Sequence, residues 1–294
     1  MNSLLIQADE LRARLGRPGC LVFDVRHDLA DTQAGRRAYE TAHIPGALYL
    51  DPEAQLSGPR TGRNGRHPLP ERQEFAALMR SQGLTARSQV FVYDAGTSMF
   101  AARLWWMLRW LGHETVAILD GGWDAWRAAG GDVQSGWRDP ALTEAQAIQN
   151  TVLSGNPSMP QVDARAVLAN LDERRFTVLD ARAPERFSGQ AETIDPVGGH
   201  IPGAINRPFQ NNLTADGRFK TATHLRAEFE ALLGDRLDHG VVHQCGSGIT
   251  ACHNLFAMEL AGLRGSALYP GSWSEWCSDP ARPMSQAASS ADAP

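Results

Sequence analysis

The sequence predicts an α/β protein of two tandem domains, each with a mainly parallel sheet flanked by helices. Its 294 residues are about twice the length of a common domain, which favours two domains. In each half, short β-branched runs alternate with amphipathic helices, a pattern typical of a parallel sheet. Three motifs also recur from one half to the other, which indicates a tandem duplication.

The repeated motifs set the expected domain organisation. They are Phe-Asp-Val-Arg at 23–26 and Leu-Asp-Ala-Arg at 179–182, His-Ile-Pro-Gly-Ala at 43–47 and 200–204, and Gly-Gly-Trp-Asp-Ala-Trp at 121–126 and Gly-Ser-Trp-Ser-Glu-Trp at 271–276. We expect domains at 1–136 and 161–283. The polar stretch 137–160 is interpreted as a linker, and residues 284–294 as a disordered tail.

Individual strands and helices follow from hydrophobic periodicity and turn signals. In the second half, strands are expected at Phe176–Asp180 and Val241–Gln244, and helices at Thr223–Leu233 and Ile249–Leu260. In the first half, a strand is expected at Val90–Tyr93 and a helix at Ala101–Leu111.

Composition excludes several classes of protein. A net charge of −5 provides no basic stripe for nucleic acid. Residues 1–16 lack the uninterrupted apolar stretch of a signal peptide, and no segment is long enough to span a membrane. The four cysteines, Cys20, Cys245, Cys252 and Cys277, show neither a disulfide nor a zinc spacing. We therefore expect a cytoplasmic protein in a reducing compartment.

The two halves differ at one position where chemistry is expected. Aligning them places Asp94 opposite Cys245, each directly after a predicted buried strand. Ligands of α/β sheets bind beyond the carboxyl ends of the strands, so Cys245 is the candidate nucleophile. The segment 245–251 then enters a helix, whose dipole favours a thiolate by about 0.3–1 kcal/mol. Two glycines in this segment let successive N–H groups turn toward the sulfur or a persulfide anion.

Other interpretations of the cysteines were weighed. Cys20, Cys252 and Cys277 are interpreted as packing residues, and a buried packing role is the alternative for Cys245 as well. A metal site of His243, Cys245, Cys252 and His253 is disfavoured because the glycine loop suits an anion. We expect no metal and no cofactor.

The Cys245 loop, the paired His-Ile-Pro-Gly-Ala motifs and the Gly-Ser-Trp-Ser-Glu-Trp ending together resemble the tandem rhodanese family over nearly the whole chain. The resemblance implies two rhodanese-like domains, of which the C-terminal one is catalytic and the N-terminal one is a degenerate copy. The presence of Asp94 at the cysteine position agrees with this.

Within that family, the loop Cys-Gly-Ser-Gly-Ile-Thr-Ala is similar to that of the mercaptopyruvate sulfurtransferases. The implied reaction moves sulfur from 3-mercaptopyruvate through a Cys245 persulfide to a thiol, such as a thioredoxin or a small thiol, or to cyanide. Gly246, Gly248, Ile249 and Thr250 are the implied loop contacts of substrate and persulfide. Releasing pyruvate as an enolate requires a proton donor, and Ser247 supplies a hydroxyl.

The resemblance also implies a proton relay and an anion-binding residue. The relay couples Ser247 to His67 and to a carboxylate, which falls on Glu53 where the family usually has Asp. Arg186 matches the arginine that binds the substrate carboxylate. A second arginine is usual before His-Ile-Pro-Gly-Ala, but the segment 192–199 contains none.

Three alternatives remain beside this hypothesis. Thiosulfate sulfurtransferases are the nearest, although they typically carry basic residues after the cysteine. A silent rhodanese-like binding or redox module is a second. A phosphatase of related fold would need an arginine where Ala251 stands, which argues against the third.

Overall fold

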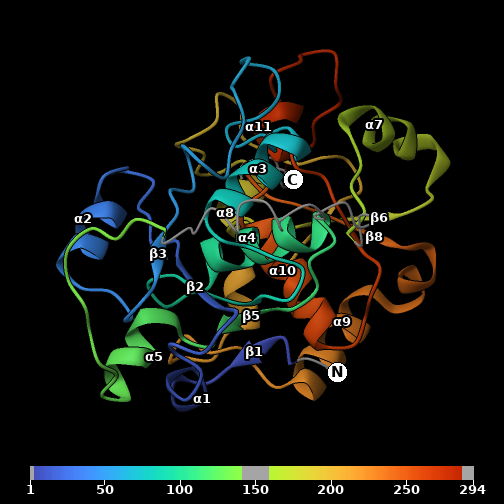
Figure 1. The fold of residues 1–294 in the computed structure, drawn as a ribbon. Coiled ribbons are helices and arrows are strands. Elements are labelled where there is room, and N and C mark those ends of the chain that lie inside the picture. The colour runs from blue at the N-terminus through green and yellow to red at the C-terminus, as the bar shows by residue number, and fades with distance from the viewer. Residues whose placement is uncertain (1–2, 141–158, 287–294) are drawn as a thin grey trace. The chain divides into compact units, whose positions relative to one another are not determined.

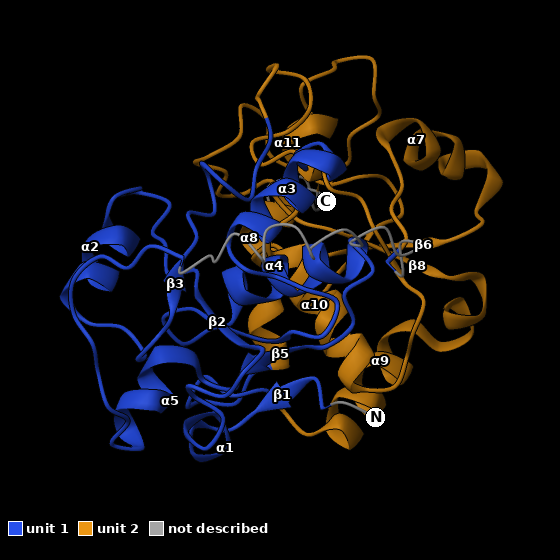
Figure 2. Cartoon of the chain, in the orientation of Figure 1, with its two compact units in different colours: residues 1–58, 69–159, 213–219 blue, residues 59–68, 160–212, 220–294 orange. Residues whose placement is uncertain are grey.

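The computed structural model describes residues 3–140 and 159–286 (Figure 1). The chain forms two compact units (Figure 2). The first comprises residues 1–58, 69–159 and 213–219, and the second comprises 59–68, 160–212 and 220–294. The expected contiguous division therefore needs a correction, because segment 59–68 groups with the second unit and segment 213–219 with the first.

Hydrogen bonds of the backbone explain both exchanges. In the second unit, the Arg66 N–H donates to Ser274 Oγ over 3.0 Å. In the first unit, the Phe219 N–H donates to Asp120 Oδ1 over 2.9 Å. Neither contact is visible in the local sequence, since each joins residues far apart in the chain.

The first unit is built on a five-stranded parallel sheet in the order β1-β5-β4-β2-β3. The strands are β1 (Leu5–Ile6), β2 (Cys20–Asp24), β3 (Leu48–Tyr49), β4 (Gln89–Tyr93) and β5 (Val116–Leu119). The helices are α1 (Ala8–Arg12), α2 (Ala34–Thr41), α3 (Arg72–Ser81), α4 (Met99–Trp110) and α5 (Gly122–Ala128). All four residues of β5 are buried, as expected of a parallel strand covered on both faces.

The second unit contains a four-stranded parallel sheet in the order β7-β6-β8-β9. Its strands are β6 (Thr177–Asp180), β7 (Ile205–Asn206), β8 (Val241–Gln244) and β9 (Ala267–Leu268). The helices are α7 (Ala164–Glu173), α8 (Pro184–Ser188), α9 (Ala222–Leu233), α10 (Thr250–Leu260) and α11 (Ser272–Trp276), with 3₁₀ turns η1 (Phe209–Asn212) and η2 (Gly234–His239). The two flanked parallel sheets confirm the predicted fold class.

The expected elements agree with the observed ones within two residues at each end. The largest difference is at α4, which begins at Met99 instead of Ala101. Helices α4 and α10 are rich in apolar residues and are buried along most of their length. Such helices belong in a protein interior. Among residues 3–140 and 159–286, no helix is both long and apolar enough to cross a bilayer.

In each unit, the repeated Asp-x-Arg motif connects the end of a central strand to neighbouring segments of the chain. In the first unit, the Arg26 guanidinium donates to Asp24 Oδ2 (2.6 Å) and to the Ala42 carbonyl (2.7 Å). The same guanidinium lies over the Trp123 ring, with 4.6 Å between its central carbon and the ring centroid. One arginine thus joins all three repeated motifs, because Ala42 precedes His43 and Trp123 lies in α5.

The second unit repeats this arrangement almost unchanged. Arg182 donates to Asp180 Oδ2 and to the Gly199 carbonyl, each over 2.7 Å. Its guanidinium carbon lies 4.7 Å from the Trp273 ring centroid. Gln244, the residue before Cys245, also donates to the Asp180 carboxylate. The fully buried Asp180 therefore ties the end of β8 to the end of β6.

The repeated His-Ile-Pro-Gly-Ala motif docks its histidine on the preceding aromatic residue. The His43 ring stacks on Tyr39 with 4.0 Å between centroids, and Nδ1 lies 2.8 Å from the Tyr39 carbonyl oxygen. The corresponding values for His200 and Phe187 are 3.9 Å and 2.8 Å. The motif therefore serves packing in both units.

The structure describes only part of the predicted disordered tail and part of the predicted linker. Residues 284–286 are ordered, which corrects the prediction for them: Ser285 forms an antiparallel bridge with His200, and Met284 packs against the core. This pairing spans 85 positions and leaves no local sequence signal. Residues 287–294 and most of the expected linker, 141–158, lie outside the described residues.

We predict that Asp180→Ala lowers the free energy of unfolding by about 3–5 kcal/mol, because it leaves the Arg182 charge buried without its main partner. Urea unfolding followed by tryptophan fluorescence measures this. Glu230→Ala is the control, since Glu230 forms an exposed pair with Arg226 in the same unit and should cost less than about 1 kcal/mol. Equal costs for both variants would contradict the role assigned to Asp180.

Candidate active site

Cys245 lies directly after β8, in the turn that leads into α10, and only 2% of its surface is exposed. Its sulfur accepts two backbone hydrogen bonds, from Gly248 N over 3.1 Å and from Ser247 N over 3.5 Å. Gly248 has a φ of +82°, which a residue with a side chain rarely adopts. The glycine is therefore needed to turn the N–H groups toward the sulfur, as the sequence predicts.

Helix α11 holds this turn from the other side. The Cys245 N–H donates to Ser272 Oγ (3.1 Å), while Trp273 N donates to the Cys245 carbonyl (2.9 Å) and Ser274 N to the Gly246 carbonyl (2.9 Å). These bonds explain why the Gly-Ser-Trp-Ser-Glu-Trp motif accompanies the cysteine loop. The backbone on both sides of the nucleophile is thereby fixed.

The first unit has the same turn without a nucleophile. Trp123 N donates to the Asp94 carbonyl (2.8 Å) and Asp124 N to the Ala95 carbonyl (3.1 Å), so Asp94 corresponds to Cys245. The Asp94 carboxylate accepts four backbone N–H groups at 2.9–3.3 Å, from Gly96, Ser98, Phe100 and Ala101. Burial raises the pKa of Asp94, and these four donors oppose the rise. The turn is thus an anion cradle filled by its own side chain.

Ser247 and His67 form a hydrogen-bonded pair in the second unit. Ser247 Oγ lies 2.7 Å from His67 Nδ1, and both side chains are buried. Ser247 follows the nucleophile by two residues, and His67 comes from segment 59–68 of the same unit. The pair can pass a proton between the hydroxyl and the imidazole beside Cys245.

Two acidic residues orient Arg186. Its Nε and Nη2 donate to the Glu192 carboxylate at 2.9–3.1 Å, and Nη2 also donates to Asp195 Oδ2 over 3.0 Å. Burial acts to raise the pKa of Glu192, but the hydrogen bonds from Arg186 and the backbone outweigh it and lower that pKa. Asp195 also pairs with Arg66 Nη1. One carboxylate therefore connects two guanidinium groups.

Both guanidinium groups lie over the residue next to the nucleophile. A Cβ atom placed on Gly246 would be 2.8 Å from Arg66 Nη2 and 3.5 Å from Arg186 Nη1 and Nη2. The sequence predicts Arg186 at the site but not Arg66 or Asp195. One feature of the sequence could have pointed to Arg66 as a site residue, namely its position directly before His67.

Two stretches of the chain, residues 7–129 and 163–279, match the rhodanese-like domain. The chain belongs to the rhodanese family. The tandem arrangement predicted from the internal repeat is thereby confirmed, and this rhodanese carries its loop cysteine in the second copy.

Relatives of known name cover nearly the whole rhodanese chain. It is 46% identical over 287 residues to a probable 3-mercaptopyruvate sulfurtransferase of Pseudomonas aeruginosa, covering 96% of this chain and 98% of the relative. A putative thiosulfate sulfurtransferase of Mycobacterium tuberculosis is 39% identical, covering 96% and 97%. The crystal structure of the 3-mercaptopyruvate sulfurtransferase SseA of Escherichia coli superposes with a TM-score of 0.78 at 32% identity, covering 92% of this chain and 99% of that one.

The remaining predicted site residues have separate positions. Glu53 lies in the first unit after β3, where its N–H donates to Asp51 Oδ1 over 2.8 Å. Its place in the relay stays a prediction. Ile249 is buried and directly precedes α10, whose first residue is Thr250. Their contacts to a donor or a persulfide also stay predictions.

The other three cysteines lie in packing environments. Burial raises the pKa of Cys277 to about 11 and also raises that of Cys20, which disfavours the reactive thiolate. Cys252 is fully buried, and its Sγ donates to the Gly248 carbonyl over 3.3 Å. Across the described parts of the rhodanese chain, no group of three or more His, Cys, Asp or Glu residues could hold a metal.

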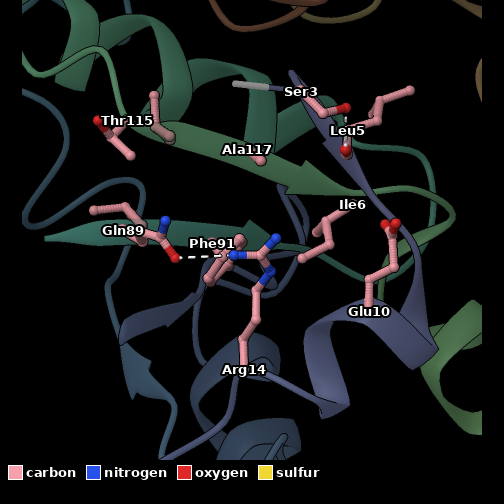
Figure 3. A pocket seen from close by; sticks show the side chains of 11 residues that line it. Ser3, Leu5, Ile6, Glu10, Arg14, Gln89, Phe91, Thr115 and Ala117 are labelled. Atoms are coloured by element: carbon pink, nitrogen blue, oxygen red, sulfur yellow. Dashed lines mark hydrogen bonds between the residues drawn. The ribbon is translucent and has the colours of Figure 1, made fainter. Parts of the chain in front are cut away.

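A hollow in the first unit offers no comparable chemistry (Figure 3). It lies beside β1, β4 and β5, and its walls include Ile6, Glu10 and Phe91. Arg14 reaches across it, donating to Gln89 Oε1 over 3.1 Å (Figure 3). Its lining contains neither cysteine nor histidine, so we place the chemistry at Cys245.

We predict that Cys245→Ser abolishes sulfur transfer, because a hydroxyl is a far weaker nucleophile and sulfur carrier than a thiolate. Steady-state assays with 3-mercaptopyruvate and a thiol acceptor measure this. Cys20→Ser, Cys252→Ala and Cys277→Ser are the matched controls and should retain activity. Sulfur transfer by Cys245→Ser at the wild-type rate would contradict the assignment.

Proposed function

We propose that this rhodanese transfers sulfur from 3-mercaptopyruvate to a thiol or to cyanide through a persulfide on Cys245. The Cys245 thiolate attacks the donor sulfur, the carbon–sulfur bond breaks, and its electron pair leaves with the carbon as the enolate of pyruvate. Protonation of that carbon gives pyruvate. An acceptor thiolate then attacks the outer sulfur, the sulfur–sulfur bond breaks, and Cys245 leaves as the thiolate. This sequence requires no cofactor.

The observation that carries the choice of donor is the 2.7 Å hydrogen bond between Ser247 and His67. An enolate is a strongly basic leaving group, so a proton donor beside the breaking bond lowers the barrier. Sulfite, the leaving group from thiosulfate, is much less basic than an enolate, so a proton donor lowers the barrier to its departure much less. The names of the P. aeruginosa and E. coli relatives support the same donor.

In this proposal, Arg186 binds the donor carboxylate. Its Nη1 can donate to that carboxylate, while Glu192 and Asp195 hold Nε and Nη2 and so fix the orientation of the guanidinium. From its position over Gly246, Arg186 would hold this carboxylate next to the nucleophile. We expect the persulfide to be lined by four residues of the turn, Gly246, Gly248, Ile249 and Thr250. Gly246 would leave room for it, and the other three lie where the turn enters α10.

We assign the third relay position to Glu53, whose carboxylate would orient His67 for proton transfer. The acceptor is proposed to be a thioredoxin or a small thiol. We further propose a reducing, cytoplasmic setting, since all four cysteines are free thiols and the reaction needs one of them as a thiolate.

Thiosulfate sulfurtransferase is a second candidate function, favoured by one specific observation. Arg66 brings a second positive charge to Gly246 beside that of Arg186. The turn itself has no basic residue, but two guanidinium groups nearby suit a dianionic donor. The name of the M. tuberculosis relative agrees with this candidate.

The two candidates predict different responses to Ser247→Ala. If the hydroxyl protonates an enolate, kcat/KM with 3-mercaptopyruvate should fall by about 10²–10⁴-fold, while kcat/KM with thiosulfate falls much less. His67→Ala should reproduce part of this selectivity. The measurement is kcat/KM for both donors in the wild type and each variant.

The control is Ser278→Ala, which removes a hydroxyl that donates to the carbonyl of Glu275 and should leave kcat/KM unchanged with both donors. Equal losses with both donors in Ser247→Ala would show that Ser247 shapes the turn without assisting protonation. A wild-type kcat/KM that favours thiosulfate would replace the main proposal by the second candidate.

A further inference from the structure

We propose that Arg66 is a donor-binding residue, which together with Arg186 forms a two-guanidinium site for the anionic group of the sulfur donor. This inference rests on the proposed sulfur transfer at Cys245 and names a contact that the sequence does not predict. The site would take a small carboxylate or sulfonate whose transferable sulfur lies within about three bonds of the charge-bearing group, as it does in 3-mercaptopyruvate and in thiosulfate.

The backbone of Arg66 is attached to the structure that fixes the nucleophile. Its N–H donates to Ser274 Oγ, and the Ser274 N–H donates to the Gly246 carbonyl. Gly65 has a φ of +85°, and a Cβ there would lie 2.7 Å from the Gly271 carbonyl oxygen. Segment 59–68 can therefore approach α11 this closely only with a glycine before Arg66.

The side chain of Arg66 is oriented by a buried carboxylate. Asp195 Oδ1 pairs with Arg66 Nη1, and its Oδ2 accepts from Arg186 Nη2. The Asp195 side chain is only 2% exposed, so its charge is offset by the two guanidinium groups instead of by water. A carboxylate held between two arginines fixes their spacing and their planes.

The remaining guanidinium nitrogens lie beside Gly246, the residue after the nucleophile. Among residues 3–140 and 159–286, no hydrogen bond engages Arg66 Nη2 or Arg186 Nη1. Arg66 Nη2 lies 2.8 Å from the position of an added Cβ on Gly246, and Arg186 Nη1 lies 3.5 Å from it, as does Arg186 Nη2. Donors on two separate arginines are thus directed into the same space beside Cys245.

Arg66 also accounts for a missing residue. The family resemblance implies a second arginine before His-Ile-Pro-Gly-Ala, but segment 192–199 supplies Asp195 instead. Because Asp195 pairs with Arg66, segment 192–199 contributes the carboxylate anchor that orients the arginine. Segment 59–68 contributes the arginine itself. The anion site is therefore completed by a residue 129 positions away from its anchor.

Protection of Cys245 from alkylation by iodoacetamide tests the site without turnover. Pyruvate, a carboxylate product of the proposed reaction, should slow alkylation of the wild type. In Arg66→Ala the pyruvate concentration giving half protection should rise by about 10- to 100-fold, since a charged hydrogen bond is lost. Arg66→Lys should restore part of the protection, because it keeps the charge and loses the planar fork.

Arg63→Ala is the matched control, as it removes an exposed arginine of the same segment and should leave protection unchanged. Alkylation rates without pyruvate show whether the Cys245 turn is intact in each variant. If Arg66→Ala fails to fold, Arg66→Gln replaces it, keeping length and polarity without the charge.

Single-turnover loading of sulfur from 3-mercaptopyruvate and thiosulfate completes the test. The second-order loading rate should fall in Arg66→Ala with each donor that the wild type uses. Unchanged loading and half protection within twofold of wild type would overturn the role of Arg66 and leave the sulfur transfer standing. A wild type that loads from neither donor, yet loses pyruvate protection in Arg66→Ala, would overturn the proposed function and leave the anion site standing.

Discussion

The candidate site depends on one constraint, which is that backbone N–H groups of a tight turn must point at the sulfur of Cys245. The positive φ of Gly248 makes this turn possible, and the hydrogen bonds from α11 hold it on both sides of the nucleophile. Charge-assisted hydrogen bonds from a fixed backbone stabilise an anion without moving during the reaction. A thiolate and a persulfide are both anions, so one cradle serves both halves of the proposed cycle.

The two copies show what this cradle does when the residue at its centre changes. With Asp94, four N–H groups close on a carboxylate of the chain itself, and the turn becomes a structural element. With Cys245, the same turn holds a nucleophile. The Asp-x-Arg and tryptophan contacts are nearly the same in both units. The two copies thus share the frame, while the residue at the centre of the turn and the residues that follow it separate the candidate catalytic copy from the filled one.

Local patterns in the sequence predict the fold and part of the site. Strand β8, helix α10 and the glycine turn between them follow from neighbouring residues, so the position of Cys245 in that turn could be predicted. His67 was found through the family resemblance. Arg66 and the ordered residues 284–286 were missed, because their partners Asp195 and His200 lie 129 and 85 positions away, respectively, and the sequence contains no local signal for such pairings. Glu53 belongs to the other unit, so its relay role rests on the resemblance.

The most direct test of the account is to locate the transferred sulfur by peptide mass spectrometry after brief exposure of the whole protein to 3-mercaptopyruvate. We expect one additional sulfur atom on the peptide that contains Cys245, removable by a thiol or cyanide. Fragment ions should place the sulfur on Cys245 and not on Cys252, which lies on the same tryptic peptide, and the peptides that contain Cys20 and Cys277 should gain none. Sulfur on any of those cysteines in place of Cys245, or no sulfur on the protein with either 3-mercaptopyruvate or thiosulfate, would contradict it.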